Sequence, residues 1–228
     1  LYVLFIYTVL FLLSASASAS KQFKIIEHMP EGTNIEAHKN VPLWPYDGET
    51  GPLYWGKLDP SFASCEKGVE QSPVSIESSH LESDKKKKIN VRYQPAAVTL
   101  MKNGHAVQAE LSALNNQLTL DGKKYKLLQF HFHHPSEHTI KGKRYPMEIH
   151  FVHQDSEKRL AVLGVMVKEG RENEEISSLL KSLEHNGEIM IDLKNLVPNQ
   201  SKAFQYKGSL TTPPCTEGVR WAVLETPL

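Results

Sequence analysis

A histidine-rich stretch, Leu127-Leu-Gln-Phe-His-Phe-His-His-Pro-Ser-Glu-His138, constrains this chain more than any other part of it. Apolar and polar residues alternate in it, and side chains along a β-strand point to opposite faces with a period of two. The pattern predicts a strand with Gln129, His131 and His133 on one face and two phenylalanines on the other. Neighbouring imidazoles on a strand fit either a solvated polar face or a metal site that a third ligand completes.

A candidate for that third ligand lies in Tyr145-Pro-Met-Glu-Ile-His-Phe-Val-His153, where Glu148 and His150 alternate with apolar residues. If this segment pairs antiparallel with the first, His150 faces His131 and His133 across strands whose paired side chains lie about 5 Å apart. Three neutral imidazoles on a rigid sheet favour Zn²⁺, with a fourth position left open for water as in catalytic zinc sites. The two segments together therefore predict a zinc site.

These segments, with several others, resemble the α-class carbonic anhydrases in their bacterial-like secreted form. The matching motifs follow the family's order from about residue 44 to residue 221. They are Gln71-Ser-Pro-Val-Ser-Ile76, Asn103-Gly-His105, Gln129-Phe-His-Phe-His133, Ser136-Glu-His-Thr139, Glu148-Ile-His-Phe-Val-His153 and Gly208-Ser-Leu-Thr-Thr-Pro-Pro214.

The resemblance implies a fold and an activity. The fold would be a single domain, mainly β with a few short helices, built on a central, mostly antiparallel twisted sheet of the α-carbonic anhydrase type. The activity would be that of a carbonate dehydratase, a zinc lyase that hydrates carbon dioxide reversibly to bicarbonate and a proton by attack of zinc-bound hydroxide. The zinc ligands would be His131, His133 and His150.

The family's other site residues map onto this chain in the same way. Gln129 would hold the imidazole of His131, and Glu148 that of His150. The hydroxyl of Thr211 would accept a hydrogen bond from the hydroxide and donate its own proton to Glu137. His105 would be the proton shuttle. Tyr46, Asn103 and Gln108 would form the polar wall. The substrate pocket would be formed by Val152, Val162, Leu210, Thr212 and Trp221.

The beginning of the sequence indicates export. Residues 1–19 are an apolar run followed by small residues with Ala-x-Ala spacing, which predicts a signal peptide cleaved after Ala17 or Ala19, although an uncleaved anchor is the alternative. Residues 20–43 are polar and aperiodic, so we expect a flexible leader. An even cysteine count in an exported chain suggests one disulfide between Cys65 and Cys215, which secreted relatives carry at matching places, and two free thiols are the alternative. We expect a periplasmic or secreted protein.

Composition narrows the partners. The chain has 228 residues, 40% hydrophobic and 23% charged, with formal net charge zero, which fits one globular domain with a sizeable core. A zero balance gives no argument for nucleic acid or an anionic membrane as partner. We therefore expect carbon dioxide and bicarbonate as partners, no nucleic acid, and no stable membrane insertion after signal cleavage. The oligomeric state stays open.

Periodicity predicts several further elements. Residues 160–167 form a near-continuous apolar run, typical of a buried central strand. Asn173 is a candidate cap for a helix whose apolar positions fall at i, i+3, i+4 and i+7 from Ile176. Turn signals separate short strands predicted at residues 89–93, 97–101, 105–111 and 117–120.

Two alternatives to the carbonic anhydrase activity are a non-catalytic zinc-binding member of the family and a weak zinc hydrolase. A zinc store would not need Glu137 or Thr211, and a catalytically dead member typically lacks a ligand histidine. Family members also continue beyond the point that matches Leu228. We therefore expect the domain at residues 44–228 to be C-terminally incomplete, residues 219–224 to be poorly covered and the imidazole of His133 to lack a backbone partner.

Overall fold

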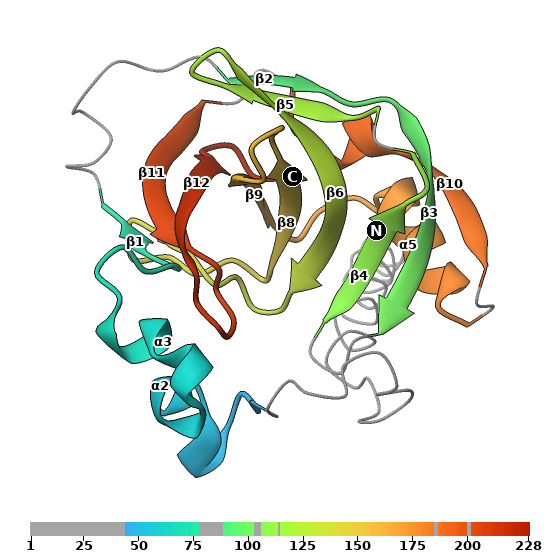
Figure 1. Ribbon diagram of the computed structural model, residues 1–228. Coiled ribbons are helices and arrows are strands. Elements are labelled where there is room, and N and C mark those ends of the chain that lie inside the picture. Colours follow the sequence, from blue (N-terminus) through green and yellow to red (C-terminus); the bar gives the residue numbers. More distant parts are fainter. Residues whose placement is uncertain (1–43, 78–88, 103–105, 114, 185–186, 200–201) are drawn as a thin grey trace, which may run out of the picture.

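The computed structural model describes residues 44–77, 89–102, 106–113, 115–184, 187–199 and 202–228 (Figure 1). The predicted signal peptide, the predicted leader, Asn103 and His105 lie outside these residues. No helix among the described residues is long and apolar enough to cross a membrane.

The described chain contains six short helical elements and a separate two-stranded pair. The helical elements are η1 (Gly48–Thr50), α2 (Trp55–Leu58), η2 (Pro60–Phe62), α3 (Ser64–Lys67), α5 (Glu174–Ser182) and η3 (Leu193–Leu196). The strands β1 (Ser75–Ile76) and β7 (Thr139–Ile140) pair in parallel as a small separate sheet.

A twisted sheet of ten strands forms the rest of the fold. Eight of them follow the order β10-β3-β4-β6-β8-β9-β12-β11, and β5 pairs with both β2 and β6 beside this path. Within the ten, β9 and β12 run parallel and the other pairings are antiparallel. The predicted fold class is confirmed. The strands are β2 (Ile89–Arg92), β3 (Pro95–Lys102), β4 (Val107–Leu111), β5 (Gln117–Leu120), β6 (Lys123–His133), β8 (Met147–Gln154), β9 (Leu160–Val167), β10 (Glu188–Asp192), β11 (Ala203–Ser209) and β12 (Glu217–Leu224).

The two histidine-bearing segments pair as the sequence predicts. Strands β6 and β8 are antiparallel neighbours, with His131 opposite His150 and His133 opposite Glu148. The next strand, β9, places Gly164 opposite His150. The register therefore carries the polar side chains of β6 and β8 to one face at the centre of the sheet.

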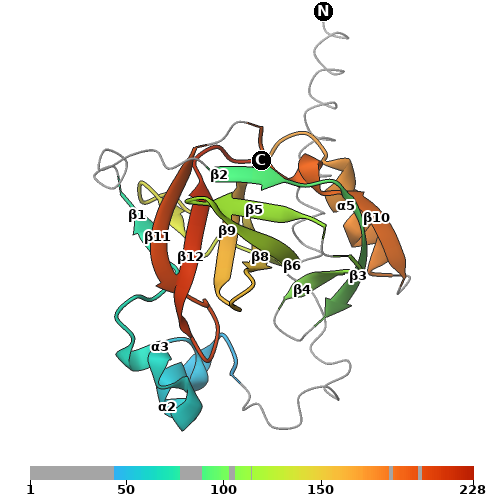
Figure 2. The ribbon, with the colours of Figure 1, turned by 45° about the horizontal axis from the view of Figure 1, so that its top comes forward.

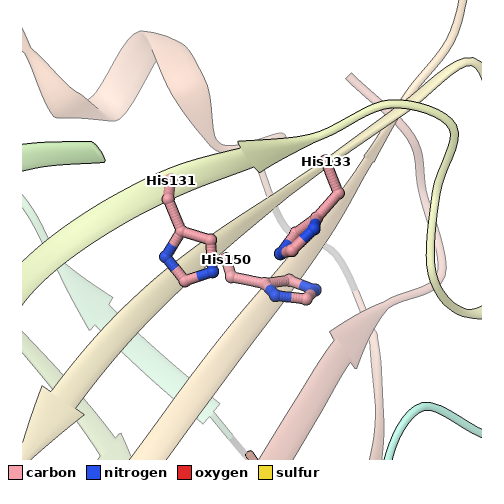
Figure 3. A group of neighbouring side chains, drawn as sticks. All are labelled: His131, His133 and His150. Carbon is pink, nitrogen blue, oxygen red and sulfur yellow. The ribbon is translucent and has the colours of Figure 1, made fainter. Parts of the chain in front are cut away.

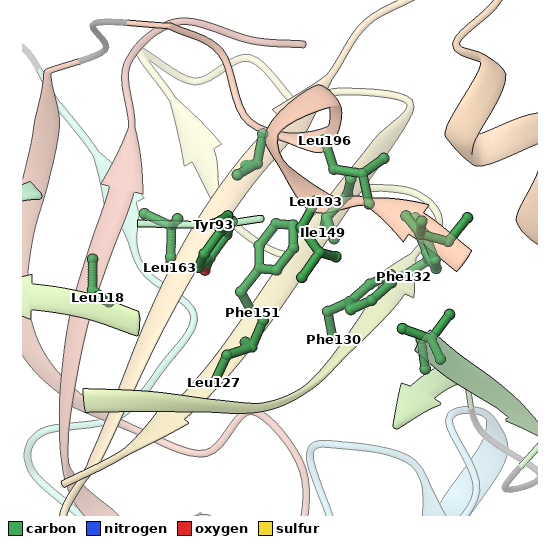
Figure 4. Close-up of a cluster of buried hydrophobic side chains, with 14 of the residues drawn as sticks. Tyr93, Leu118, Leu127, Phe130, Phe132, Ile149, Phe151, Leu163, Leu193 and Leu196 are labelled. Atoms are coloured by element: carbon green, nitrogen blue, oxygen red, sulfur yellow. The ribbon is translucent and has the colours of Figure 1, made fainter. Parts of the chain in front are cut away.

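The other face holds the larger apolar core. Phe130, Phe132 and Phe151 lie fully or almost fully buried there, together with leucines of η3 (Figure 4). Helix α5 covers this face, and Asn173 caps it by accepting from the backbone N–H groups of Glu175 and Ile176, as predicted. The alternation along β6 thus separates an aromatic core from an imidazole face.

The prediction that residues 219–224 are poorly covered is wrong. Strand β12 lies between β9 and β11, and its residues Val219, Trp221 and Val223 are at most 2% exposed. Beyond β12, the backbone of Leu228 exchanges hydrogen bonds with Met166 and Lys168 at 2.8 and 3.0 Å. Two paired neighbours and these terminal contacts cover the strand.

The predicted disulfide is present and ties the first helices to a distant loop. Cys65 in α3 bonds to Cys215, with 5.0 Å between their Cα atoms. Cys215 lies in the loop between β11 and β12, which reaches toward α2 and α3 in both views (Figures 1 and 2). The side chain of Gln71 adds hydrogen bonds to the Cys215 carbonyl and to Glu217. This loop also carries Thr211 and Thr212, so the crosslink anchors predicted site residues.

Candidate metal centre

Three imidazoles converge on the polar face of β6 and β8. The side chains of His131, His133 and His150 point toward one another (Figure 3), and each offers a nitrogen within 4.8 Å of those of the other two. Their ring centroids lie 4.5 to 5.3 Å apart. The structure therefore brings together the three predicted ligands with a spacing that could hold a metal ion.

Each ring has a nitrogen that can face the common centre. His131 Nδ1 lies 2.9 Å from Gln129 Oε1, which leaves Nε2, and His150 Nε2 lies 2.9 Å from Glu148 Oε1, which leaves Nδ1. The His150 contact is bent away from the N–H direction, so it is a charge-assisted contact and not a linear hydrogen bond. His133 Nε2 is buried and has no hydrogen-bond partner among the described residues. Nitrogen donors in this state fit a metal such as Zn²⁺.

Burial keeps two of the candidate ligands neutral. Burial, reinforced by the neighbouring His150, lowers the pKa of His131 to about 3 and holds the pKa of His133 well below its ordinary value. Burial would also lower the pKa of His150, but the Glu148 and Glu137 carboxylates outweigh it and raise that pKa. Metals bind the neutral imidazole, so the site favours the ligand form of His131 and His133 at neutral pH.

Glu148 is a fully buried carboxylate with a complete set of partners. Its Oε2 accepts from the backbone N–H groups of Glu137 and His138, both at 3.0 Å. Its Oε1 lies 2.8 Å from His138 Nδ1 as well as 2.9 Å from His150 Nε2. Burial would raise the pKa of Glu148, but His150 and His138 outweigh it and hold the pKa well below its usual range. A buried charge is tolerable only with partners of this kind.

Glycine at position 164 makes room for that carboxylate. A Cβ atom there would lie 3.0 Å from Glu148 Oε1. Glycine inside a strand often marks such a close approach. The apolar run of β9 therefore contains one residue that the polar site requires.

Glu137 faces the same centre as the imidazoles. Its Oε2 lies 3.4 Å from His133 Nε2 and 3.7 Å from His150 Nδ1, and this oxygen atom has no hydrogen-bond partner in the described part of the chain. The carboxylate accepts a hydrogen bond from the Thr211 side chain. Burial raises the pKa of Glu137 to about 7, against the opposing effects of His150 and Thr211. Glu137 Oε2 and His133 Nε2, which have no hydrogen-bond partners among the residues that the structure describes, thus converge where an ion and its water would lie.

Apolar side chains line the neighbouring part of this face. Val152, Val162 and Trp221 are cross-strand neighbours in β8, β9 and β12, and Leu210 packs against the cluster that they form. The Trp221 ring lies 4.9 Å from that of His150, and its Nε1 donates to the Ser209 carbonyl. Four of the five predicted pocket residues, all but Thr212, therefore lie together beside the imidazoles.

The remaining predicted residues occupy the periphery. Gln108 pairs in register with His131 and donates to Glu110 at 3.2 Å. Tyr46 packs edge-on against Trp44 and Trp55 and is 42% exposed. The Thr212 carbonyl accepts from the Cys215 N–H, which shapes the loop.

Sequence reasoning missed the residues behind Glu148. None of His138, Tyr206 and Ser72 was assigned a role in the site, yet a continuous series of contacts joins all three. Two features of the sequence could have pointed to these residues: Ser72 within the Gln71-Ser-Pro motif, and the lone glycine of β9.

Two other features do not qualify as sites. His138, Glu148 and His150 also lie close enough for a metal, but the contacts of His138 Nδ1 and His150 Nε2 with the carboxylate occupy these atoms. A small cavity between α5 and strands β3, β4 and β6 has an entirely apolar lining that includes Phe132 and Leu179. It lies on the face of the sheet opposite the histidines.

Comparison with known proteins gives consistent matches. Residues 50–228 match the family described as eukaryotic-type carbonic anhydrase. The carbonic anhydrase of Neisseria gonorrhoeae is 43% identical over 195 residues, covering 83% of this chain and 77% of that protein. The carbonic anhydrase of Klebsiella pneumoniae is 38% identical, covering 81% of this chain and 77% of that one.

Solved structures agree with the sequence matches. The α-carbonic anhydrase of Thermovibrio ammonificans, in complex with the inhibitor sulfanilamide, superimposes with a TM-score of 0.76 at 38% identity, covering 83% of this chain and 86% of that one. Dioscorin in complex with ascorbate gives a TM-score of 0.75 at 31% identity, covering 81% and 82% of the two chains.

Proposed function

Since this chain belongs to the eukaryotic-type carbonic anhydrase family, whose reaction is the reversible hydration of carbon dioxide, we propose that it performs this reaction with zinc held by His131, His133 and His150. The observation that carries the proposal is the convergence of these three imidazoles within 4.8 Å. The neutral imidazoles of His131 and His133 support zinc as the ion, as does His133 Nε2, which has no hydrogen-bond partner among the described residues.

Zinc in such a site lowers the pKa of a coordinated water to about 7, an established property of carbonic anhydrases, and so supplies hydroxide at neutral pH. The chain's own residues would hold the ligands in place. Gln129 accepts from His131 Nδ1, and the Glu148 carboxylate lies 2.9 Å from His150 Nε2, so each ring turns its other nitrogen inward. Partners of this kind fix the tautomer of a ligand histidine and raise its basicity.

Thr211 and Glu137 would orient the attacking oxygen. The Thr211 hydroxyl donates to the Glu137 carboxylate, so its oxygen can only accept from the nucleophile. That arrangement fixes the direction of one O–H bond and turns a lone pair toward the substrate, which is an orientation effect.

Carbon dioxide is small and apolar, and an apolar wall beside the imidazoles suits it. We assign this wall to Val152, Val162, Leu210 and Trp221, which lie together on the imidazole face. Thr212, in the same loop as Thr211, would contact the bicarbonate side. The polar wall would be Tyr46, Asn103 and Gln108.

Each hydration releases a proton that must reach the solvent. We assign this step to His105, because a histidine with a pKa near 7 can both accept and release a proton at neutral pH. His105 lies outside the described residues, so this assignment comes from the Asn103-Gly-His motif.

The disulfide between Cys65 and Cys215 supports export, since such bonds persist in oxidising compartments. We propose that residues 1–19 are removed as a signal peptide, that residues 20–43 form a leader and that the enzyme acts in the periplasm or outside the cell, with carbon dioxide and bicarbonate as its partners.

Zinc analysis of purified variants tests the ligand assignment. His131→Ala, His133→Ala and His150→Ala should each lose zinc, because three protein ligands are the usual set of an open catalytic site. His134→Ala is the matched control, since the adjacent imidazole is turned to the Pro146 carbonyl at 2.6 Å. Full zinc occupancy in His150→Ala would refute the assignment.

A further inference from the structure

A series of buried and partly buried polar contacts leads away from the candidate ligand His150. It passes from Glu148 Oε1 to His138 Nδ1 at 2.8 Å, and from His138 Nε2 to the Tyr206 hydroxyl at 2.6 Å. The Tyr206 hydroxyl then lies 2.8 Å from Ser72 Oγ. The series therefore joins β8, the segment after β6, β11 and the segment before β1.

The chemistry of the groups fixes the direction of every proton in this series. A carboxylate only accepts, so His138 Nδ1 carries a proton and its Nε2 is an acceptor. Tyr206 must then donate to His138 Nε2, and Ser72 must donate to the Tyr206 oxygen. Burial raises the pKa of the Tyr206 phenol, which keeps it protonated as this role requires.

The outer end of the series is held rigidly. Ser72 and Ser209 exchange two hydrogen bonds, from Ser72 N to Ser209 Oγ at 2.9 Å and from Ser209 N to Ser72 Oγ at 3.1 Å. The Tyr206 ring stacks on Trp221, with a centroid distance of 6.0 Å and an interplanar angle of 10°. Glycine at position 208 allows this packing, because a Cβ there would clash with Ser72 Oγ. The tyrosine hydroxyl thus has a fixed position.

We propose that Tyr206 is a positioning residue of the metal site, which acts through His138 and Glu148 to hold His150 with Nε2 protonated and Nδ1 turned toward the metal. Without the tyrosine hydroxyl, His138 is free to exchange its protonated nitrogen. A His138 protonated on Nε2 gives Glu148 no donor from its ring, so the carboxylate loses a partner that fixes its Oε1. The inference rests on the zinc site of the proposed function.

The test compares two tyrosine-to-phenylalanine variants. Tyr206→Phe removes the hydroxyl that faces His138. Tyr93→Phe is the matched control, because its hydroxyl also lies 2.7 Å from a buried histidine, His153, but on the aromatic side of the sheet. Both variants lose one tyrosine–histidine hydrogen bond of similar length, so their zinc-free melting temperatures should fall by similar amounts.

Only Tyr206→Phe should change the metal site. We expect its zinc dissociation constant, measured by chelator competition, to rise about tenfold, the lower end of the range for partners of metal ligands. The visible spectrum of its Co²⁺ derivative should also shift, while Tyr93→Phe leaves both unchanged. Ser72→Ala should also raise the zinc dissociation constant, by a smaller factor. This variant replaces Tyr206→Phe in the test if Tyr206→Phe does not fold.

A readout without metal separates this inference from the proposed function. In the zinc-free wild type, ¹⁵N NMR should find His138 protonated on Nδ1 alone, and in Tyr206→Phe it should find both tautomers. Unchanged tautomers in Tyr206→Phe, or equal zinc affinities for the two tyrosine variants, would overturn the role of Tyr206. A wild type with the expected tautomer that binds no zinc would instead overturn the proposed zinc site.

Discussion

At the scale of single residues, the candidate centre is a set of three imidazoles, and an amide or a carboxylate stands behind two of them, His131 and His150. Gln129 contacts one ring nitrogen of His131, and Glu148 contacts one ring nitrogen of His150. The second nitrogen of each ring is therefore available to bind a metal. Thr211 and Glu137 would instead orient the attacking oxygen. The two pairs should therefore respond differently to substitution.

Thr211→Ala should retain zinc and lose turnover. The variant removes a group that orients the nucleophile and leaves the metal ligands intact, so we expect kcat/KM for carbon dioxide hydration to fall roughly 100-fold. Thr211→Ser keeps the hydroxyl and should recover most of the activity. Wild-type kcat/KM in Thr211→Ala would show that the hydroxyl has no part in the reaction.

His153 should make stability depend on pH. Burial lowers its pKa to about 3 from an ordinary 6.5. Below pH 6.5 the imidazole therefore binds a proton in the unfolded chain, whereas in the folded protein it stays neutral until the pH approaches 3. This contribution is complete above pH 6.5 and is lost as the pH falls toward 3. Between pH 7 and pH 5 the loss is about 2 kcal/mol.

Urea unfolding at the two pH values, compared with His153→Gln, isolates that contribution. The variant keeps an amide but cannot titrate, so its unfolding free energy should fall by about 2 kcal/mol less than that of the wild type between pH 7 and pH 5. Equal falls in the two proteins would mean that His153 is protonated in the folded state.

At the scale of elements, short polar–apolar alternation was enough to predict the strands that carry the site. The register of β6 with β8 followed from the matching histidines and is confirmed by His131 opposite His150. The helix at 173–183 was also predictable, because its cap and its apolar spacing are local signals. The burial of β12 could not be predicted in this way, because it depends on pairing with β9, which lies some 60 residues earlier in the chain.

The residues behind Glu148 show a second limit of sequence reasoning. Tyr206 and Ser72 meet His138 only after β11 and the segment before β1 are brought to the same place. No periodic pattern relates positions that lie so far apart in the chain. His105 and the leader stay predictions, because they lie outside the described residues.

The disulfide should stabilise both the fold and the loop of Thr211. It joins residues 150 positions apart, and closing so long a loop in the unfolded chain is worth about 4–5 kcal/mol in the loop-entropy estimate. The Cys65→Ser, Cys215→Ser variant should lose stability of this order in urea unfolding and show a lower kcat/KM. Wild type under reducing conditions is the control and should behave like the variant. Unchanged stability in both would show that the hydrogen bonds of Gln71 alone hold the loop.

At the scale of the whole molecule, one sheet serves two purposes. One face packs an aromatic and aliphatic core under α5 and η3, and the other face presents imidazoles beside an apolar wall. The large buried face makes the sheet rigid, and the sheet places three candidate ligands at metal spacing. The family's reaction follows from this division, because carbon dioxide needs an apolar contact next to a bound nucleophile.

The most direct test of the account is stopped-flow carbon dioxide hydration by the purified wild type and by His150→Ala, with zinc measured in the same samples. The account predicts about one zinc ion per chain and rapid hydration in the wild type, and the loss of both in the variant. A wild type that holds zinc at this site and does not accelerate hydration above the buffer rate would contradict it.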